Sequence, residues 1–288
     1  MNPKYSIIIP HHNSSDTLIR LVNSIPEDER FQIIIVDDNS DETEIDKISI
    51  INQSNVEFIW LKICGGAGVA RTKGLQYAKG TWIMFADSDD YYMPDFDNTV
   101  ERLITENYSS DIIIFNIDSN GNNSLQGKRY YNYIFNFNGT EESWVDVKYR
   151  TWTPWAKVFR RTFIEEHQLY FEARKKGNDC YFVLNAMVKA KSIIIDKTEI
   201  YHLSYSPNSL SHTKNDSWEY MFDVYDLWLW RYSFFREHHI LLWEEYNIFY
   251  LLAEIRKKFG WFKMLSMFFH SFTYRYNYIL LFKTNILK

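Results

Sequence analysis

The stretch FADSDDYYMP, residues 85–94, places three carboxylates at the end of the apolar run TWIMFA. Asp87 and Asp89 flank a single residue, so their side chains point the same way if the strand extends through them. Like-charged carboxylates held that close repel each other unless a cation lies between them. Carboxylate oxygens suit Mg²⁺ or Mn²⁺, which commonly keep positions open for substrate phosphates. The stretch therefore predicts a divalent-cation site where a buried strand ends.

The chain from residue 5 to about residue 116 alternates short β-branched runs with helical periods. The runs are apolar throughout, and they read YSIII, FQIIIV, VEFIWL, TWIMFA and DIIIF. Such strands, separated by helices, indicate a parallel sheet covered on both faces. We therefore expect an α/β fold, in which ligands bind at the carboxyl ends of the strands.

Polar side chains follow four of these runs, as PHHN, DDNS, CGGAGVAR and DSDD. Asp, Asn and Ser are ordinary helix caps and loop residues, so any one cluster also has a purely structural explanation. Four clusters at one edge of one sheet favour a binding site instead. His11 and His12, in the first cluster, read as loop residues without an assigned role.

The rest of the chain divides into three parts. Residues 117–150 lose the alternation of strands and helices and are typical of hairpins or loops. Residues 151–206 regain compact signals in WTPWAKVFRR, GNDCYFVLNAMV and SIIID, and beyond about residue 215 the sequence is helical and strongly aromatic. We expect a catalytic-sized domain over residues 1–210 and a helical appendage over residues 211–288.

Composition limits the functional class. The 288 residues are 46% hydrophobic and 18% aromatic, which is enough to bury a large core. A net charge of -5 argues against nucleic acid as the main partner. Cys64 and Cys180 form neither a metal spacing nor a disulfide framework, which suits a reducing compartment. The apolar run near the N-terminus is too short for a signal peptide, and no segment is apolar enough to span a membrane. We expect a cytoplasmic protein.

Several other ion- or phosphate-binding classes fail on spacing. An EF-hand loop starting at Asp37 needs Gly at its sixth position, where this chain has Glu42. GGAGVA is neither a dinucleotide fingerprint nor a Walker A loop. Nothing favours a phosphoaspartate enzyme over metal binding. A nucleotidyltransferase needs a basic, glycine-rich loop after the first strand, and PHHNSSD is not one.

Taken together, IIIPHHN, IIIVDDNSDE, GGAGVARTKGL and FADSDD resemble, in order and spacing, the glycosyltransferase family 2 enzymes of GT-A fold. WAKVFRR and GNDCYF are similar to the second half of that family, so the resemblance covers about residues 4–210. It implies a GT-A nucleotide-sugar-binding mixed sheet flanked by helices, with residues 1–116 binding the donor and 117–210 the acceptor. It also implies an inverting transfer from a UDP-hexose or UDP-N-acetylhexosamine with Mn²⁺ or Mg²⁺, forming a β linkage. The QxxRW motif of processive members is absent, so one sugar per encounter is expected.

The resemblance assigns residues to the nucleotide. Pro10 and Asn13 would line it, and Asp38 would accept the N3–H of uracil with Asp37 beside it.

It also assigns residues to the diphosphate. Arg71 would steady the diphosphate or the aspartates, Asp87 would bind ribose or metal, and Ser88 would belong to the donor site. Asp89 would be the direct metal ligand, so that the cation neutralises the leaving diphosphate. Thr72 stands where the family usually has Asn.

On the acceptor side, inversion needs a base that removes the proton of the attacking hydroxyl. Asp179 is the candidate, and the alternative is that it only caps a helix from Cys180 to Val188. Asn178 stands where the family more often has Glu. His202 is a candidate for contact with the diphosphate or the metal, and a structural role stays open for it.

Trp152 and Trp155 are candidates for a sugar-stacking platform, because an aromatic face suits the C–H side of a pyranose. Core packing is the alternative for both.

The C-terminal region is basic and aromatic, with seven Lys or Arg and one Glu in residues 251–288. Its cations include Arg256, Lys257, Lys258, Lys263, Arg275 and Lys283. This pattern resembles an interfacial helix that binds an anionic membrane surface, and a helix pair packed on protein is the alternative. A peripheral position on the inner face of the cell membrane would suit a glycan acceptor carried on a lipid diphosphate, as in bacterial O-antigen or capsule synthesis.

A rival from another class is a catalytically weak scaffold protein of a polysaccharide assembly complex that keeps the fold. The presence of both Asp89 and Asp179 argues against this hypothesis, whereas Asn178 leaves it open.

Overall fold

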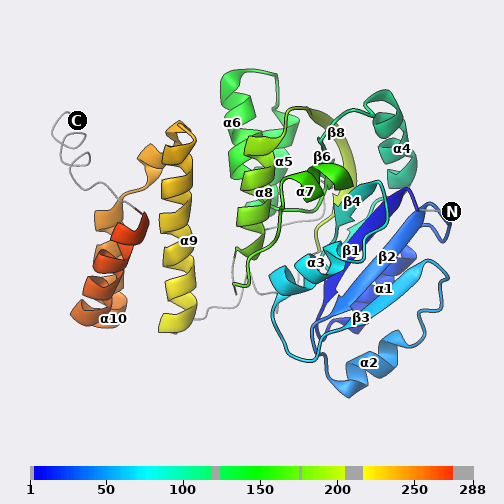
Figure 1. Cartoon of the computed structure of the whole chain (residues 1–288), viewed down its shortest axis with the longest axis horizontal. Coiled ribbons are helices and arrows are strands. Elements are labelled where there is room, and N and C mark those ends of the chain that lie inside the picture. The colour runs from blue at the N-terminus through cyan, green and yellow to red at the C-terminus, as the bar shows by residue number, and fades with distance from the viewer. Residues whose placement is uncertain (1–2, 119–123, 175–176, 205–216, 275–288) are drawn as a thin grey trace. The chain divides into compact units, whose positions relative to one another are not determined.

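A computed structural model describes residues 3–118, 124–174, 177–204 and 217–274 (Figure 1). The chain forms two compact units, one of residues 1–174 with 178–212 and the other of residues 175–177 with 213–288.

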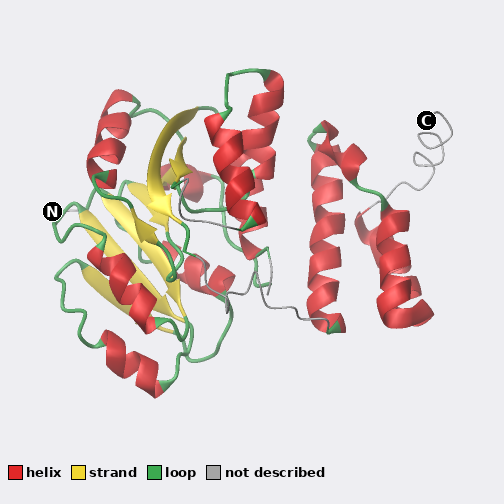
Figure 2. Ribbon diagram, turned by 180° about the vertical axis from the view of Figure 1, so that it is seen from behind, coloured by secondary structure: helices red, strands yellow, loops and turns green. Residues whose placement is uncertain are grey.

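The first unit is built on one eight-stranded sheet in the order β3-β2-β1-β4-β7-β6-β8-β5 (Figure 2). The strands are β1 Tyr5–His11, β2 Phe31–Asp37, β3 Val56–Trp60, β4 Trp82–Phe85, β5 Tyr91–Tyr92, β6 Ile112–Ile117, β7 Lys157–Arg160 and β8 Ile193–His202. Strands β1 to β4 pair in parallel, whereas β7 runs antiparallel to β4 and β6. The sheet is therefore mixed, as the family resemblance predicted, and the parallel pattern of the first runs holds for β1 to β4.

Helices flank this sheet (Figures 1 and 2). They are α1 Ser15–Asn23, α2 Glu42–Ile48, α3 Ala67–Leu75, α4 Phe96–Glu106, α5 Leu125–Phe135, α6 Glu141–Arg150, α7 Arg161–Glu166 and α8 Asn178–Lys189. The core forms because the central strands are apolar on both faces: Ile7, Ile8 and Ile9 of β1 are all fully buried.

The prediction of hairpins or loops for residues 117–150 is wrong, because α5 and α6 occupy most of this segment. Tyr130 and Ile134 lie one turn apart on α5 and are buried, as is Val147 on α6. Ser124 and Thr140 cap the two helices, each accepting a hydrogen bond from a backbone N–H in the first turn. The Asn, Ser and Gly residues in the sequence before α5, with two Asn and one Gly between the helices, hid the short apolar stripes.

The sheet register brings the candidate loops together. His11 at the end of β1 pairs with Asp37 at the end of β2, and Asp37 pairs with Trp60 at the end of β3. On the other side of β1, Ile8 pairs with Phe85, the last residue of β4. The polar clusters that follow β1 to β4 therefore start from one edge of the sheet.

The second unit is helical. It contains α9 Trp218–Glu237, the 3₁₀ helix η1 Leu241–Glu245, α10 Ile248–Ser271 and the 3₁₀ helix η2 Phe272–Tyr274. The helical, aromatic character predicted beyond residue 215 is confirmed for residues 217–274. Within the described residues, no helix combines the length and the hydrophobicity needed to cross a membrane. Arg275 and Lys283, two of the predicted membrane-binding cations, lie outside those residues.

Candidate functional site

The loop after β4 is held in place by the phenol of Tyr201 on β8. The Asp87 backbone N–H donates to the Tyr201 hydroxyl at 2.9 Å, and that hydroxyl donates to Oδ2 of Asp90 at 2.9 Å. The backbone N–H of Ser204 donates to the other Asp90 oxygen at 2.8 Å. Asp90 is buried, and its pKa is raised by burial and by the charges of Asp89 and Asp87. Of the three crowded carboxylates, Asp90 thus anchors the loop.

Asp87 and Asp89 are the two carboxylates left for a ligand. Burial, together with the charge of Asp87, raises the pKa of Asp89 to about 6. A bound cation would relieve this repulsion, and both groups offer the hard oxygen donors that Mg²⁺ and Mn²⁺ prefer. No cluster of three or more His, Cys, Asp or Glu side chains suited to a metal is found among the described residues. Two carboxylates cannot enclose such a cation by themselves, so a cation held there would need further ligands such as phosphate or water.

Arg71 joins this loop to α8. It lies on α3, it is only 5% exposed, and its guanidinium forms an ion pair with Asp87. Its Nη1 also donates to Oδ1 of Asn178 at 2.8 Å, and Asn178 is the first residue of α8. One side chain therefore links a predicted metal-site carboxylate to the residue beside Asp179.

Helix α3 also holds the segment that precedes α8. A Cβ on Gly68 would lie 2.1 Å from the backbone oxygen of Glu172, so only glycine allows this approach. The Thr72 hydroxyl donates to the Phe171 carbonyl at 3.2 Å and accepts from the Phe171 N–H at 3.0 Å. Thr72, a departure from the family pattern, thus has a defined contact that joins the predicted donor and acceptor halves.

Asp179 lies in the first turn of α8. The residue is partly exposed, yet the dense surroundings of its carboxylate desolvate the charge and raise its pKa to about 6. The charge of Arg71 lowers this pKa and that of Asp87 raises it, so the base candidate responds to both groups. A carboxylate that titrates near 6 suits general-base work at neutral pH.

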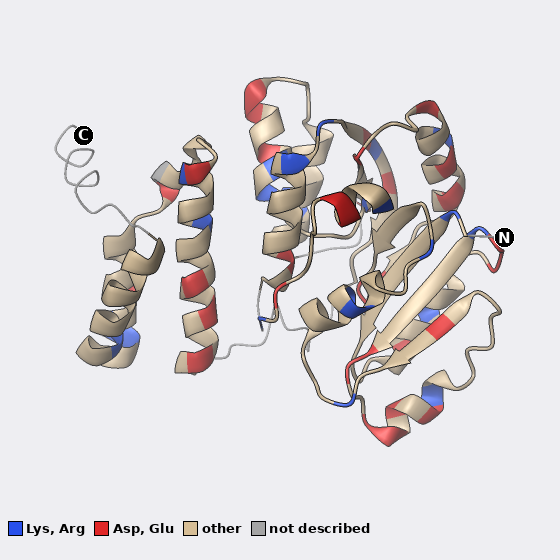
Figure 3. Cartoon of the chain, in the orientation of Figure 1, with Lys and Arg blue, Asp and Glu red and all other residues tan. Residues whose placement is uncertain are grey.

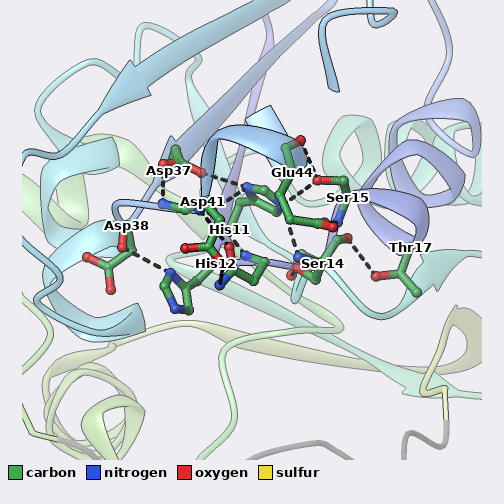
Figure 4. A network of polar contacts seen from close by, with 12 residues as sticks. His11, His12, Ser14, Ser15, Thr17, Asp37, Asp38, Asp41 and Glu44 are labelled. Carbon is green, nitrogen blue, oxygen red and sulfur yellow. Dashed lines mark hydrogen bonds and ion pairs between the residues drawn. The ribbon is translucent and has the colours of Figure 1, made fainter. Parts of the chain in front are cut away.

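The predicted nucleotide end of the site contains a buried pair that the sequence patterns did not predict. The prediction that His11 is a loop residue is wrong, because His11 is the last residue of β1 and is buried. Its Nδ1 contacts Oδ2 of Asp37 at 2.8 Å (Figure 4). The Ser40 N–H donates to Asp37 Oδ1 at 2.9 Å, and the Ser14 N–H donates to His11 Nε2 at 3.3 Å. Burial alone would raise the pKa of Asp37, but the hydrogen bonds from His11 and Ser40 hold it below its usual range. This pair fixes the loops after β1 and β2. The sequence signal that could have predicted it is the pairing of positions 11 and 37 in adjacent parallel strands.

Asp38 holds the loop before α3. Its carboxylate accepts from the N–H groups of Gly65 and Gly66 at 2.7 Å each, and from Cys64 Sγ at 3.1 Å. The predicted contact with uracil N3–H would use a remaining lone pair of this carboxylate.

Asn13 lies in the loop after β1, and Pro10 lies in β1 itself. Asn13 has a left-handed φ of 50°, and its side-chain oxygen accepts from the Asp41 N–H at 2.8 Å. Pro10 is buried within β1. In the same region, Ser14 Oγ lies 2.8 Å from Oγ of Ser88, which ties the first loop to the loop after β4.

His202 lies on β8, opposite Tyr91 of β5. Its Nδ1 contacts Oδ2 of Asp118 at 2.7 Å, and its ring stacks on Tyr91 with centroids 4.4 Å apart. The Arg20 guanidinium lies 5.0 Å from the centroid of the same Tyr91 ring. With Nδ1 engaged, Nε2 is the ring nitrogen with which His202 would contact a ligand.

The two tryptophans predicted to contact the acceptor differ in how deeply they are buried. Trp155 is only 5% exposed and packs against Tyr130 and Tyr201, with ring centroids 4.7 and 5.9 Å apart. This environment favours the core-packing alternative over a sugar platform. Trp152 is partly buried at the border of the core. It stays a candidate for acceptor contact.

Comparison with known proteins gives a consistent result. The family model described as "Glycosyl transferase family 2" matches residues 6–168. A poly(ribitol-phosphate) beta-glucosyltransferase of Bacillus spizizenii is 30% identical over 210 residues, which are 69% of this chain and 32% of that protein. The chain thus spans about a third of that relative's length. The Escherichia coli UDP-Glc:alpha-D-GlcNAc-diphosphoundecaprenol beta-1,3-glucosyltransferase WfaP is 40% identical over 90 residues, 31% of this chain and 36% of WfaP.

Solved structures share the fold. That of Staphylococcus aureus TarS in complex with UDP-GlcNAc matches with a TM-score of 0.64 and 23% identity, over 80% of this chain and 65% of that one. The Pyrobaculum calidifontis mannosyltransferase PcManGT, in complex with GDP-Man and Mn²⁺, matches with a TM-score of 0.60 and 11% identity, over 99% and 84% of the chains. The mixed sheet flanked by helices is therefore that of the GT-A glycosyltransferases, as predicted.

Proposed function

The chain belongs to glycosyl transferase family 2, and on this premise we propose that it transfers one sugar from a nucleotide-diphosphate sugar to a hydroxyl of a glycan acceptor. The observation that carries the proposal is the bridge made by Arg71, which joins Asp87 of the predicted donor site to Asn178, the neighbour of Asp179. One side chain thus links the groups that would hold the diphosphate to the group that would activate the acceptor.

The donor is proposed to be a UDP-hexose or a UDP-N-acetylhexosamine. Support comes from the relatives, because WfaP is described as using UDP-Glc and TarS binds UDP-GlcNAc. Asp87 and Asp89 would hold Mn²⁺ or Mg²⁺, which when bound would neutralise charge developing on the leaving diphosphate. Arg71 adds a fixed positive charge beside these carboxylates.

Transfer would proceed with inversion in one displacement. Asp179 removes the proton of the acceptor hydroxyl while the hydroxyl oxygen attacks the anomeric carbon, and the bond from that carbon to the diphosphate oxygen breaks. The electron pair leaves with the nucleoside diphosphate. The raised pKa of Asp179, about 6, leaves the carboxylate ionised at neutral pH but more basic than an ordinary aspartate.

The acceptor is proposed to be a glycan on a lipid diphosphate. The name of WfaP specifies a diphosphoundecaprenol-linked acceptor, and the basic, aromatic second unit suits a position at the inner face of the cell membrane. The process would be bacterial O-antigen, capsule or related polysaccharide synthesis. In this proposal, residues 1–116 bind the donor, 117–210 bind the acceptor and 211–288 contact the membrane.

The test is a transfer assay with UDP-Glc and UDP-GlcNAc in turn, Mn²⁺, and a GlcNAc-diphospholipid acceptor. The expected result is an extended glycolipid by mass spectrometry, with a β anomeric configuration by NMR. An α product would contradict inversion. A chain that binds UDP yet transfers no sugar to any glycolipid would instead support the scaffold hypothesis.

A further inference from the structure

The second half of α10 and the first residue of η2 carry an exposed apolar stripe. Phe262, Leu265, Phe269 and Phe272 are spaced by three, four and three residues, so they lie on one side of the helical segment. Their exposed fractions are 89%, 45%, 65% and 50%, and Trp261 beside them is 61% exposed. A contiguous apolar surface of this kind is uncommon on a soluble domain and marks an interaction site.

The opposite side of the same segment is already packed within the second unit. Met267 and Ser271 are fully buried, and Nε2 of His270 contacts Oδ1 of Asp226 on α9 at 2.6 Å. These contacts fix which side of the helix faces α9. The stripe therefore lies on the side that α9 leaves uncovered.

Gly260 separates the stripe from the first half of α10. Its φ of 82° and ψ of 179° are non-helical, and a positive φ of this kind favours glycine. A Cβ built on Gly260 would have no atom within 4 Å, so the conformation rather than the space calls for glycine. The break lets the segment after Gly260 take its own direction.

Cations gather at the border of the stripe. Arg256, Lys257 and Lys258 are exposed shortly before Gly260, and Nζ of Lys258 also pairs with Glu254 at 3.3 Å. Figure 3 shows Lys and Arg gathered in one part of α10, whose remainder carries almost no charge. The guanidinium of Arg256 lies 4.8 Å from the ring centroid of Trp261, which places this cation against the stripe itself.

We propose that the α10 face, defined as Phe262, Leu265 and Phe269 of α10 and Phe272 of η2 with the cations Arg256, Lys257 and Lys258, docks on an anionic lipid surface. Aromatic side chains enter the boundary between headgroups and acyl chains, while neighbouring cations bind anionic headgroups. The stripe spans about 15 Å, half of the roughly 30 Å hydrocarbon core, so it lies in the interface plane.

Charge favours an anionic lipid surface over a second copy of the chain as the partner of the α10 face. Two α10 faces meeting each other would bring both sets of cations together, with Glu254 as the one acidic residue of α10 to offset them. An anionic lipid surface complements both the stripe and its border. This inference rests on the proposed function in one respect: docking on lipid would bring the site to an acceptor that is carried by lipid.

The test is flotation of the full chain with vesicles of phosphatidylcholine alone and of phosphatidylcholine with phosphatidylglycerol. The expected result is binding to the anionic vesicles that weakens as salt is added. Phe262→Ser/Phe269→Ser should weaken it at least about tenfold, and Lys257→Glu/Lys258→Glu should remove most of the dependence on anionic lipid. The matched control is Ile50→Ser/Leu125→Ser, which removes two exposed apolar side chains from the first unit.

Two results would overturn the proposal: equal binding by the Phe262→Ser/Phe269→Ser variant, or no binding to anionic vesicles by the wild type. A dimer that this variant dissociates, seen by light scattering without vesicle binding, would assign the face to a second copy instead. UDP titration of the same variants separates the proposals. Vesicle binding without nucleotide binding would contradict the proposed function alone, and the reverse would contradict the lipid-docking proposal alone.

Discussion

Arg71 and Asp87 form an ion pair that joins α3 to the loop after β4. The same guanidinium donates to Asn178 at 2.8 Å, so the pair extends to the first turn of α8. In the proposed reaction, this connection sets the position of Asp179 relative to the donor carboxylates.

Arg71→Lys should lower kcat by at least about tenfold, because a lysine ammonium lacks the planar fork that contacts Asp87 and Asn178 together. The measurement is steady-state kinetics at saturating donor. Asn178→Ala should also lower kcat, since it removes the acceptor of the 2.8 Å hydrogen bond. The matched control is Arg102→Lys on α4, whose side chain is 52% exposed. Unchanged kcat in both site variants would show that the bridge does not position the base.

Asp179→Asn should reduce transfer by roughly 100- to 10,000-fold, the usual contribution of a general base. Donor binding should be unchanged, because Asp179 lies on the acceptor side of the proposed site. Single-turnover transfer and UDP titration measure the two properties separately. The control Asp16→Asn changes a carboxylate that is 84% exposed. Transfer at the normal rate by Asp179→Asn would refute the assignment of the base.

The pH dependence of kcat should have an acidic limb with a midpoint near 6, because Asp179 with a pKa of about 6 must be ionised to accept a proton. Activity therefore rises with pH through this value, whereas an ordinary aspartate, with a pKa of about 3.9, would already be ionised at pH 5. The measurement requires saturating donor and Mn²⁺, which keep Asp89 ionised in the proposed site. A kcat that stays constant down to pH 5 would contradict a base with this pKa.

Tyr201→Phe should destabilise the first unit by about 1–3 kcal/mol, because it leaves the Asp87 N–H and one oxygen of Asp90 without their buried partner. Denaturant unfolding measures the change. Tyr92→Phe is the matched control, because Tyr92 is equally buried and its hydroxyl has no hydrogen-bond partner in the described part of the chain. Equal stability of the two variants would show that the phenol of Tyr201 does not support the loop.

Much of the first unit is predictable from local patterns. The β-branched runs become β1 to β4 and β6, and the polar clusters lie at the carboxyl ends of the parallel strands, because each run is largely apolar and its polar cluster comes directly after it. The insertion of antiparallel β7 between β4 and β6 is not visible in the runs themselves. It depends on pairing between segments more than forty residues apart, as between Ile113 and Val158.

The sequence predicts which residues belong to the candidate site better than it predicts the contacts that they make. Period-two spacing singles out Asp87 and Asp89 as candidates, but the direction in which Asp90 points depends on Tyr201, more than a hundred residues away. The His11–Asp37 pair depends on strand register, and the burial of Trp155 depends on the rings packed around it. These features depend on long-range packing, so local sequence patterns cannot predict them.

The proposed donor site is tested most directly by isothermal titration of the full chain with UDP, with and without Mn²⁺, beside the Asp89→Ala variant. We expect UDP binding that needs Mn²⁺ and is lost in Asp89→Ala, while Asp179→Asn binds as the wild type does. Parallel titrations with GDP and dTDP should show weaker binding. Metal-independent UDP binding, or equal binding by Asp89→Ala, would contradict the donor site placed at Asp87 and Asp89.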